Sequence, residues 1–272
     1  MQFSGLTDLP FEPYFVTGAP RTGTSILHAL ICTDDAVNDY INECSYFTAL
    51  LQPFMVGWKT FDDHTKAYFA ASRQRFIDYH GQLIRSVLRD IWEQLGRPKK
   101  LVLKDPVLSR SMHLMAQLVP ASKYIITIRD PRDVMASRVV VMRKTDATAV
   151  VGDRDIEKVC KEFNASYTAL INMGDIFAGR ALLVPYEALA QSGNMKSIED
   201  FMGIAIRKDR VWQSELTDVS RAEGNAWNTE QYGKPLNADS VGNYKKLLDE
   251  AQVALVEKLC APQMQALGMP LV

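Results

Sequence analysis

Residues 14–31 read YFVTGAPRTGTSILHALI, and this stretch decides the fold. A short apolar run comes first, a segment with glycines at positions 18 and 23 follows, and an apolar helical pattern begins near residue 23. Glycines at that spacing let the backbone wrap around an anion, and a helix N-terminus adds unpaired N–H groups and the positive end of its dipole. The stretch therefore predicts a strand, a phosphate-binding loop and a helix.

The loop nearly matches the P-loop pattern GxxxxGK[ST] and differs from it at one position. Thr24 stands where the pattern has lysine, and Arg21 adds a cation inside the loop. A kinase or NTPase uses that lysine, together with a Mg²⁺ ligand, to handle the β- and γ-phosphates. The loop therefore suits a donor with less negative charge at its reacting end, such as a sulfuryl group. A P-loop-type nucleotide kinase or NTPase is the alternative, and a non-catalytic nucleotide binder is a further one.

Further short apolar runs lie at residues 101–103, 124–128 and 181–184, and none alternates apolar with polar residues. Runs of this kind are typical of strands that are buried on both faces, as in a parallel sheet covered by helices on each side. Helical patterns lie between the runs. We expect helices that start near residue 23 or span residues 62–95, 109–118, 131–144, 155–177 and 246–267.

This alternation of strands and helices predicts an α/β fold of three layers, with a mostly parallel central sheet flanked by helices, like that of P-loop NTPases. No internal repeat, low-complexity tract or long linker divides the chain. We therefore expect a single domain over residues 1–272, with a helical insertion at about 34–98 between the first two strands. The insertion would place Glu43 beside the glycine-rich loop.

The charge balance excludes binding through a global basic field. Lys and Arg number 31 against 32 for Asp and Glu, which gives a net charge of -1, so we expect no nucleic-acid partner. The four cysteines are scattered without metal-ligand spacing, and we expect no metal site. No apolar stretch approaches the ~20 residues that a membrane span needs. We expect a cytoplasmic protein, and the sequence leaves a homo-oligomer open.

A second anion site is predicted where the third strand ends. Asp130 suits a helix N-cap, Pro131 suits the first helical position, and Asp133 would complete the cap. Arg129 directly precedes this helix start, and Ser137 lies about two turns into the helix. An arginine and a hydroxyl at such a corner can hold a phosphate away from the first loop. The alternative is that Arg129 is a salt-bridge partner and Ser137 a helix-surface residue.

Each of the four predicted strands is followed by polar or charged groups. The loop at 18–25 follows the first strand, Lys104 the second, Arg129 the third and Tyr186 the fourth. In a parallel α/β sheet the carboxyl ends of the strands meet at one edge, where ligands bind. We therefore expect these groups to converge on one site.

Several segments, in this order, resemble the sulfotransferases that use 3'-phosphoadenosine-5'-phosphosulfate (PAPS). The resemblance spans roughly residues 14–204, and its arginine and Lys-Asp-Pro details are closer to the protein-tyrosine and carbohydrate branches than to the cytosolic branch. It implies a transferase that moves a sulfuryl group from PAPS and releases 3',5'-adenosine bisphosphate (PAP). The segments are GAPRTGTS at 18–25, LKDPVLSRSM at 103–112, LVPASKYIITIRDPRDVMAS at 118–137, LLVPYEAL at 182–189 and IEDFMGI at 198–204.

The resemblance also implies roles for individual residues. The 5' end of the donor would be held by Arg21, Thr22, Gly23, Thr24 and Ser25. The 3'-phosphate would be held by Arg129 and Ser137, with Arg138 or Arg143 assisting. Tyr186 would lie against the nucleotide, and Lys104 would neutralise charge near the transferred group. Residues 240–245 resemble a segment that covers the donor, so Ser240 and Tyr244 are expected in the donor site.

The acceptor must lose a proton, so the site needs a base. Glu43 is our candidate, since it lies where the tyrosine-modifying branch has its glutamate base, with Arg21 and Lys104 stabilising charge. A solvated loop glutamate is the alternative reading of this residue. The four histidines are rivals, and His113 is the strongest of them. We expect a metal-independent reaction on a hydroxyl or amine, with a small-molecule, glycan or phenolic acceptor. The rival histidines are His28, His64, His80 and His113.

Overall fold

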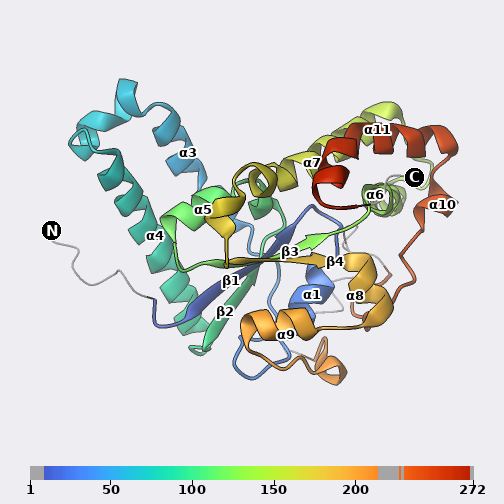
Figure 1. Ribbon diagram of the computed structural model, residues 1–272, viewed down its shortest axis with the longest axis horizontal. Helices are drawn as coiled ribbons and strands as arrows, with labels where there is room; N and C mark the ends of the chain where they lie inside the picture. Colours follow the sequence, from blue (N-terminus) through green and yellow to red (C-terminus); the bar gives the residue numbers. More distant parts are fainter. Residues whose placement is uncertain (1–8, 214–226, 228–229, 270–272) are drawn as a thin grey trace.

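A four-stranded parallel sheet forms the centre of the protein (Figure 1). The computed structural model describes residues 9–213, 227 and 230–269. The strand order β2-β1-β3-β4 means that the chain moves to one side of β1 and then returns to the other. This confirms the predicted α/β fold and all four strands. The strands are β1 (Glu12–Gly18), β2 (Lys100–Lys104), β3 (Lys123–Ile128) and β4 (Ala181–Pro185).

Helices cover both faces of β1, β2 and β3, which explains why these strands are apolar without alternation. The edge strand β4 is only partly buried, and its Leu183 is 41% exposed, so burial on both faces was wrongly expected there. On one face, Tyr14 and Val16 of β1 pack in a core with α1 (Thr24–Ile31), α8 (Tyr186–Ser192) and α9 (Lys196–Met202). On the other face, Phe15 belongs to the larger core, to which the remaining long helices contribute. These are α4 (Arg73–Gln94), α5 (Met112–Leu118), α6 (Pro131–Thr145), α7 (Asp153–Asn172) and α11 (Glu250–Ala266).

The segment between α1 and β2 is helical, and in Figure 1 its helices α3 and α4 project beyond the sheet. The predicted helix over 62–95 is wrong in its first part. Ala70 and Ala71 have φ angles of 51° and 57°, and two consecutive left-handed residues cannot continue a right-handed helix. The Ser72 side chain then accepts the Arg75 N–H and starts α4. Before it lie α2 (Tyr46–Leu50), α3 (Gln52–Lys59), a π-helical turn (Phe61–Thr65) and a 3₁₀ turn (Lys66–Phe69).

Three other predicted helices end or divide differently in the structure. The pattern at 109–118 divides into a 3₁₀ turn (Val107–Arg110) and α5, and the pattern at 155–177 divides into α7 and a 3₁₀ turn (Gly174–Phe177). At 246–267, α10 (Tyr244–Leu247) precedes α11. Short helices such as α2, α3, α8 and α9 were not predicted, because caps and tertiary packing decide them more than periodicity does.

Candidate active site at the carboxyl edge of the sheet

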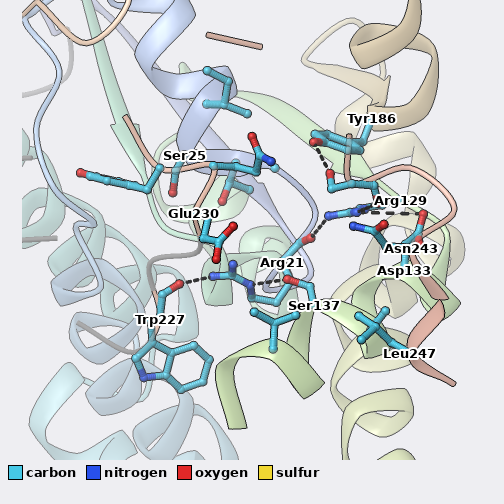
Figure 2. Close-up of a pocket in the computed structure, with 18 of the residues that line it drawn as sticks. Arg21, Ser25, Arg129, Asp133, Ser137, Tyr186, Trp227, Glu230, Asn243 and Leu247 are labelled. Atoms are coloured by element: carbon cyan, nitrogen blue, oxygen red, sulfur yellow. Dashed lines mark hydrogen bonds and ion pairs between the residues drawn. The ribbon is translucent and has the colours of Figure 1, made fainter. Parts of the chain in front are cut away.

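A pocket of about 310 Å³ lies at the carboxyl ends of β1, β3 and β4 (Figure 2). Its walls come from the loop after β1, from α6, from the start of α8 and from residues between 212 and 247. The groups after three of the four strands therefore converge as expected, whereas Lys104 does not line this pocket and reaches it only through Ser25. Eight of the predicted site residues line this pocket, namely Arg21, Gly23, Thr24, Ser25, Arg129, Ser137, Tyr186 and Ser240.

The two glycines of the loop are required by close packing. Gly18 has a φ of 145°, and a Cβ atom there would lie 2.5 Å from the Thr127 carbonyl oxygen. Gly23 has a φ of 91°, and its Cβ atom would lie 2.4 Å from the Tyr186 ring. Both values are far below a normal contact, so only glycine allows the loop to pack against β3 and against Tyr186. The ring of Tyr186 thus lies on the loop, beside the N-terminus of α1.

Thr22 is turned away from the pocket. It is fully buried, its hydroxyl donates to the Ala19 carbonyl at 2.7 Å, and the same oxygen lies 2.5 Å from Thr127 Oγ1. The side chain therefore braces the loop against β3. Thr24, at the position of the P-loop lysine, is the first residue of α1 and is 5% exposed.

Arg21 extends across the pocket from the loop. Its Nε donates to Ser137 Oγ at 3.1 Å, and Nη1 donates to the Trp227 carbonyl at 2.6 Å (Figure 2). Its φ of 77° is strained for a residue with a side chain, at a cost of about 1–3 kcal/mol. Burial lowers the pKa of Arg21 to about 10, and the charges of Arg129 and Arg138 contribute. A bound anion would relieve both the desolvation and the repulsion.

Arg129 is the second cation of the pocket, and it is buried, with 5% of the residue exposed. Nη1 donates to the Arg21 carbonyl at 3.1 Å, Nη2 donates to the Ser240 carbonyl at 2.7 Å, and the guanidinium lies 4.5 Å from the Tyr186 ring centroid. Its Nε is buried without a partner among the described residues. An unpaired buried donor costs about 1–3 kcal/mol, so an anionic ligand that accepted this N–H would bind favourably.

The helix start after β3 is capped by one carboxylate rather than two. The Asp130 side chain accepts the Arg132 N–H at 2.8 Å, and Pro131 occupies the first helical position, as predicted. Asp133 does not complete this cap, so that part of the prediction is wrong. The Asp130 N–H donates to Glu187 instead, at 2.8 Å, and the Asp133 oxygens accept from a different segment.

Lys104 and Glu43 lie together beside the first turn of α1. Lys104 Nζ donates to Ser25 Oγ at 2.9 Å and lies 3.5 Å from Glu43 Oε2. The Lys104 side chain is 7% exposed, whereas that of Glu43 is 44% exposed. Burial lowers the pKa of Lys104, and the charge of Glu43 opposes this shift. The structure thus joins the loop, a buried ammonium and a solvent-accessible carboxylate in one chain of contacts.

Two contacts hold the segment that carries Glu43. The Cys44 N–H donates to the Lys104 carbonyl at 2.7 Å. The buried Asp105 carboxylate accepts the Thr48 N–H at 3.2 Å and the Thr48 hydroxyl at 2.7 Å, which fixes the first turn of α2. The sequence analysis quoted the Lys-Asp-Pro motif but did not predict this role for its aspartate.

The segment 240–244 lies against Arg129 and Tyr186. Ser240 Oγ lies 2.9 Å from the Tyr186 hydroxyl, and the Ser240 carbonyl accepts from Arg129 as described. Tyr244 is outside the pocket, because its ring packs on Arg132 with a distance of 4.7 Å between the ring centroid and the guanidinium carbon. The structure therefore brings Ser240 to the predicted site but not the Tyr244 side chain.

The remaining candidates lie elsewhere. Arg138 covers the Trp227 ring at 4.6 Å and lies 3.7 Å from Glu162, and neither it nor Arg143 lines the pocket. The described structure includes all four histidines, and none lines the pocket either. His28 is fully buried, with Nε2 at 3.2 Å from the Val102 carbonyl, and burial lowers its pKa to about 3.

Three aromatic residues that the sequence analysis missed also line the pocket, namely Trp212, Trp227 and Tyr232. Trp212 and Tyr232 have ring centroids 4.9 Å apart, and Ile26 of α1 lies on the same wall. The Trp212 indole donates to the Lys234 carbonyl at 2.7 Å, and its residue has a strained φ of 63°. These rings offer an apolar surface to a planar group. No periodicity or motif in the sequence distinguishes them from core aromatics.

The described residues, 9–213, 227 and 230–269, lack two features. No helix in that part of the chain has the length and hydrophobicity of a membrane span. The same residues contain no group of three or more potential metal ligands.

Residues 13–209 match the profile of the sulfotransferase family. The chain is 23% identical over 273 residues to protein-tyrosine sulfotransferase A of Caenorhabditis elegans, covering 93% of this chain and 66% of that protein. It is 26% identical over 164 residues to carbohydrate sulfotransferase 3 of Tetronarce californica, covering 55% of this chain and 36% of that protein. The chain thus spans about two thirds of the first relative and about a third of the second.

A solved structure shares the fold. The sulfotransferase domain of the olefin synthase from Synechococcus PCC 7002 superposes with a TM-score of 0.58 at 16% identity, covering 93% of this chain and 96% of that one. At that identity the likeness concerns the fold alone. The family match covers more than half of the chain, and its residues include the loop, Lys104, Arg129 and Tyr186. The chain belongs to the sulfotransferase family.

Proposed function

We propose that this protein transfers a sulfuryl group from PAPS to a hydroxyl or amine acceptor. The observation that carries the proposal is a pair of arginines, the half-buried Arg21 and the buried Arg129, which reach one pocket from the ends of two neighbouring strands. Their desolvation, and the unpartnered Nε of Arg129, favour a ligand with two separate anionic groups. PAPS has anionic groups at its 5' and 3' positions, and the family of the chain supports this donor.

The residues of the pocket fit such a donor. The loop and the N-terminus of α1 offer backbone N–H groups and Ser25 for the 5'-phosphosulfate. Arg129 and Ser137 offer N–H and hydroxyl groups for the 3'-phosphate. The aromatic wall of Trp212 and Tyr232 offers an apolar surface for the purine.

The chemistry requires one bond to form and one to break. The acceptor oxygen or nitrogen attacks sulfur, and the bond between sulfur and the oxygen that bridges it to the 5'-phosphate breaks. The bonding electrons stay on that oxygen, so PAP leaves. Glu43 takes the acceptor's proton, which its solvent-accessible carboxylate can reach from the side of an incoming acceptor.

Lys104 supplies positive charge between the loop that would hold the transferred group and the base Glu43. Its Nζ contacts both Ser25 of the loop and Glu43, so one ammonium can stabilise charge on the transferred group while it orients the base. Arg21 supplies a second cation from the loop itself. With these cations in place, we expect the reaction to proceed without a metal ion.

The P-loop kinase alternative receives no support from the site. The position of the P-loop lysine holds Thr24, which is almost fully buried, and the third strand ends in an arginine rather than in an acidic Mg²⁺ ligand. The relatives named above modify protein tyrosine and carbohydrate by their names. For this chain we propose a hydroxyl acceptor of the phenolic, glycan or small-molecule class.

Turnover with PAPS tests this function. The protein is incubated with PAPS and a panel of phenols, sugars and tyrosine-containing peptides, and PAP release is followed together with the sulfated product. We expect equimolar PAP and sulfated acceptor for at least one class, with the same rate in excess EDTA. The proposal would be overturned if the protein transferred a phosphoryl group from ATP with Mg²⁺ but transferred no sulfuryl group from PAPS.

A further inference from the structure

Asp133 is a buried carboxylate that joins α6 to the segment 240–244. The residue is 1% exposed. Its Oδ2 accepts the Gly242 N–H at 2.7 Å, and its Oδ1 accepts the Tyr244 N–H at 3.0 Å. Both oxygens are thus used by two backbone donors of one short segment, which we call the cover segment (residues 240–244). Hydrogen bonds to an ionised carboxylate are about twice as strong as neutral ones.

The cover segment in turn contacts the donor site. The Ser240 carbonyl accepts from Arg129 Nη2 at 2.7 Å, and Ser240 Oγ lies 2.9 Å from the Tyr186 hydroxyl. Asp133 Oδ2 is itself 4.0 Å from Arg129 Nη2. Figure 2 shows Asp133, Arg129 and Tyr186 on the same side of the pocket. One carboxylate therefore connects the second anion site with the segment that lies over it.

This carboxylate is not needed to start α6, because Asp130 caps that helix. Burial raises the pKa of Asp133, and the N–H groups of Gly242 and Tyr244 and the charge of Arg129 oppose the shift. A buried carboxylate without such partners would destabilise the fold. The cover segment supplies these partners, so its position stabilises Asp133 and Asp133 in turn holds the segment in place.

We propose that Asp133 is a positioning residue of the donor site, which holds the cover segment over Arg129 and so sets how tightly the nucleotide is bound. The proposal rests on the proposed function, since the nucleotide concerned is the donor or its product PAP. Asp133 acts through backbone groups and through Arg129. It therefore affects binding and release of the nucleotide more than the transfer step.

Two variants disturb the same contact from opposite sides. Asp133→Asn keeps the size of the side chain but replaces one accepting oxygen with an NH₂ group, which faces a donor. Gly242→Ala changes a residue that does not itself line the pocket. Its φ of 76° is strained for alanine, although no atom lies within 4 Å of the added Cβ. Gly203→Ala is the matched control, because Gly203 has a φ of 64° with equally open space at the end of α9.

The experiment measures PAP binding by calorimetry, PAP dissociation by stopped flow, and the kcat and donor KM of each variant. We expect Asp133→Asn and Gly242→Ala each to weaken PAP binding about tenfold through faster dissociation, the size of one lost charge-assisted hydrogen bond. The kcat should not fall by more than about twofold. For the double variant, the dissociation constant for PAP should be at most about twice that of the more affected single variant, because both changes break the same contact. Gly203→Ala should behave as the wild type.

Other results would overturn the inference without touching the proposed function. If the wild type binds PAP and both variants bind it equally well, Asp133 does not position the donor site. A lower melting temperature with an unchanged dissociation constant for the folded protein would make its role structural only. If Asp133→Asn does not fold, the comparison of PAP binding by Gly242→Ala with PAP binding by its control Gly203→Ala decides the question. Failure of the wild type to bind PAP would instead overturn the proposed function.

Discussion

At the scale of single residues, the site depends on three cations, of which Arg129 and Lys104 are buried and Arg21 is partly exposed. Arg21 donates to a hydroxyl and a carbonyl, and Arg129 donates to two carbonyls. Lys104 has the Glu43 carboxylate at 3.5 Å, and Arg129 has a more distant carboxylate at 4.0 Å. Motif reading could predict these four residues, because each directly follows a strand or lies in a recognisable segment. It could not predict that Thr22 faces inward. That direction depends on the contact with Thr127 of β3, which forms only in the folded protein.

Replacement of the base tests the chemistry at this scale. We expect Glu43→Gln to lower kcat by about 10²–10⁴, the usual contribution of a general base, with PAP affinity within about twofold of the wild type. The amide is the same size but cannot accept the proton. Steady-state turnover with PAPS and calorimetry with PAP measure the two effects. Glu93→Gln, on α4, is the control. A kcat within threefold of the wild type would assign the base to another group.

The loop glycine next to Tyr186 gives a second test. Gly23→Ala would put a Cβ atom 2.4 Å from the Tyr186 ring at a φ of 91°. We expect the ring and the loop to separate and PAP binding to fall by at least about tenfold, measured by calorimetry. Gly179→Ala, at a φ of 68° in open space, should bind PAP normally. Equal binding by Gly23→Ala and Gly179→Ala would mean that this contact does not shape the site.

At the scale of elements, the strand ends and the starts of α1 and α6 place the site. The strands and the Asp130–Pro131 helix start could be predicted, because buried parallel strands and N-caps leave local signals in the sequence. The break at Ala70–Ala71, the fixing of α2 by Asp105 and the contact between Asp133 and the cover segment could not. Each depends on groups that meet only through tertiary structure. The aspartate next to Lys104 therefore reads as a motif residue in sequence and as an anchor of α2 in the structure.

The buried histidine of α1 predicts a pH dependence of stability. Burial lowers the pKa of His28 to about 3, and the charge of Lys104 adds to the shift. Because the unfolded chain takes up this proton near pH ~6.5 and the folded chain does not, stability that is present above that pH is lost as the pH falls. The loss is about 2 kcal/mol at a pH of about 5.

Urea unfolding at two pH values measures this effect. His28→Gln keeps a donor for the Val102 carbonyl and carries no titrating group. We expect its stability to fall by about 2 kcal/mol less than that of the wild type between pH values of about 7.5 and 5. His64→Gln, in the exposed π-helical turn, should follow the wild type. If His28→Gln loses as much stability as the wild type, His28 is protonated in the folded protein.

At the scale of the whole molecule, one edge of a parallel sheet gathers the groups of the candidate site. Figure 1 shows the projecting helices α3 and α4 at one end of the molecule, away from α8. The segment with Glu43 connects those helices to the loop side of the sheet. The single-domain organisation and a cytoplasmic location stay predictions, and the oligomeric state stays open. The family and the fold could be predicted from ordered motifs, whereas the aromatic wall of Trp212 and Tyr232 required the structure, because its members lie outside those motifs.

Calorimetric titration with PAP tests most directly the claim that this pocket holds a nucleotide with two anionic groups. The titration is run on the wild type and on Arg129→Ala, beside 5'-AMP and ATP with Mg²⁺. We predict that the wild type binds PAP much more tightly than 5'-AMP and that Arg129→Ala loses about 100-fold or more in PAP affinity, since a buried charged partner contributes about 3 kcal/mol. Tight binding of ATP with Mg²⁺, without binding of PAP, would contradict the account.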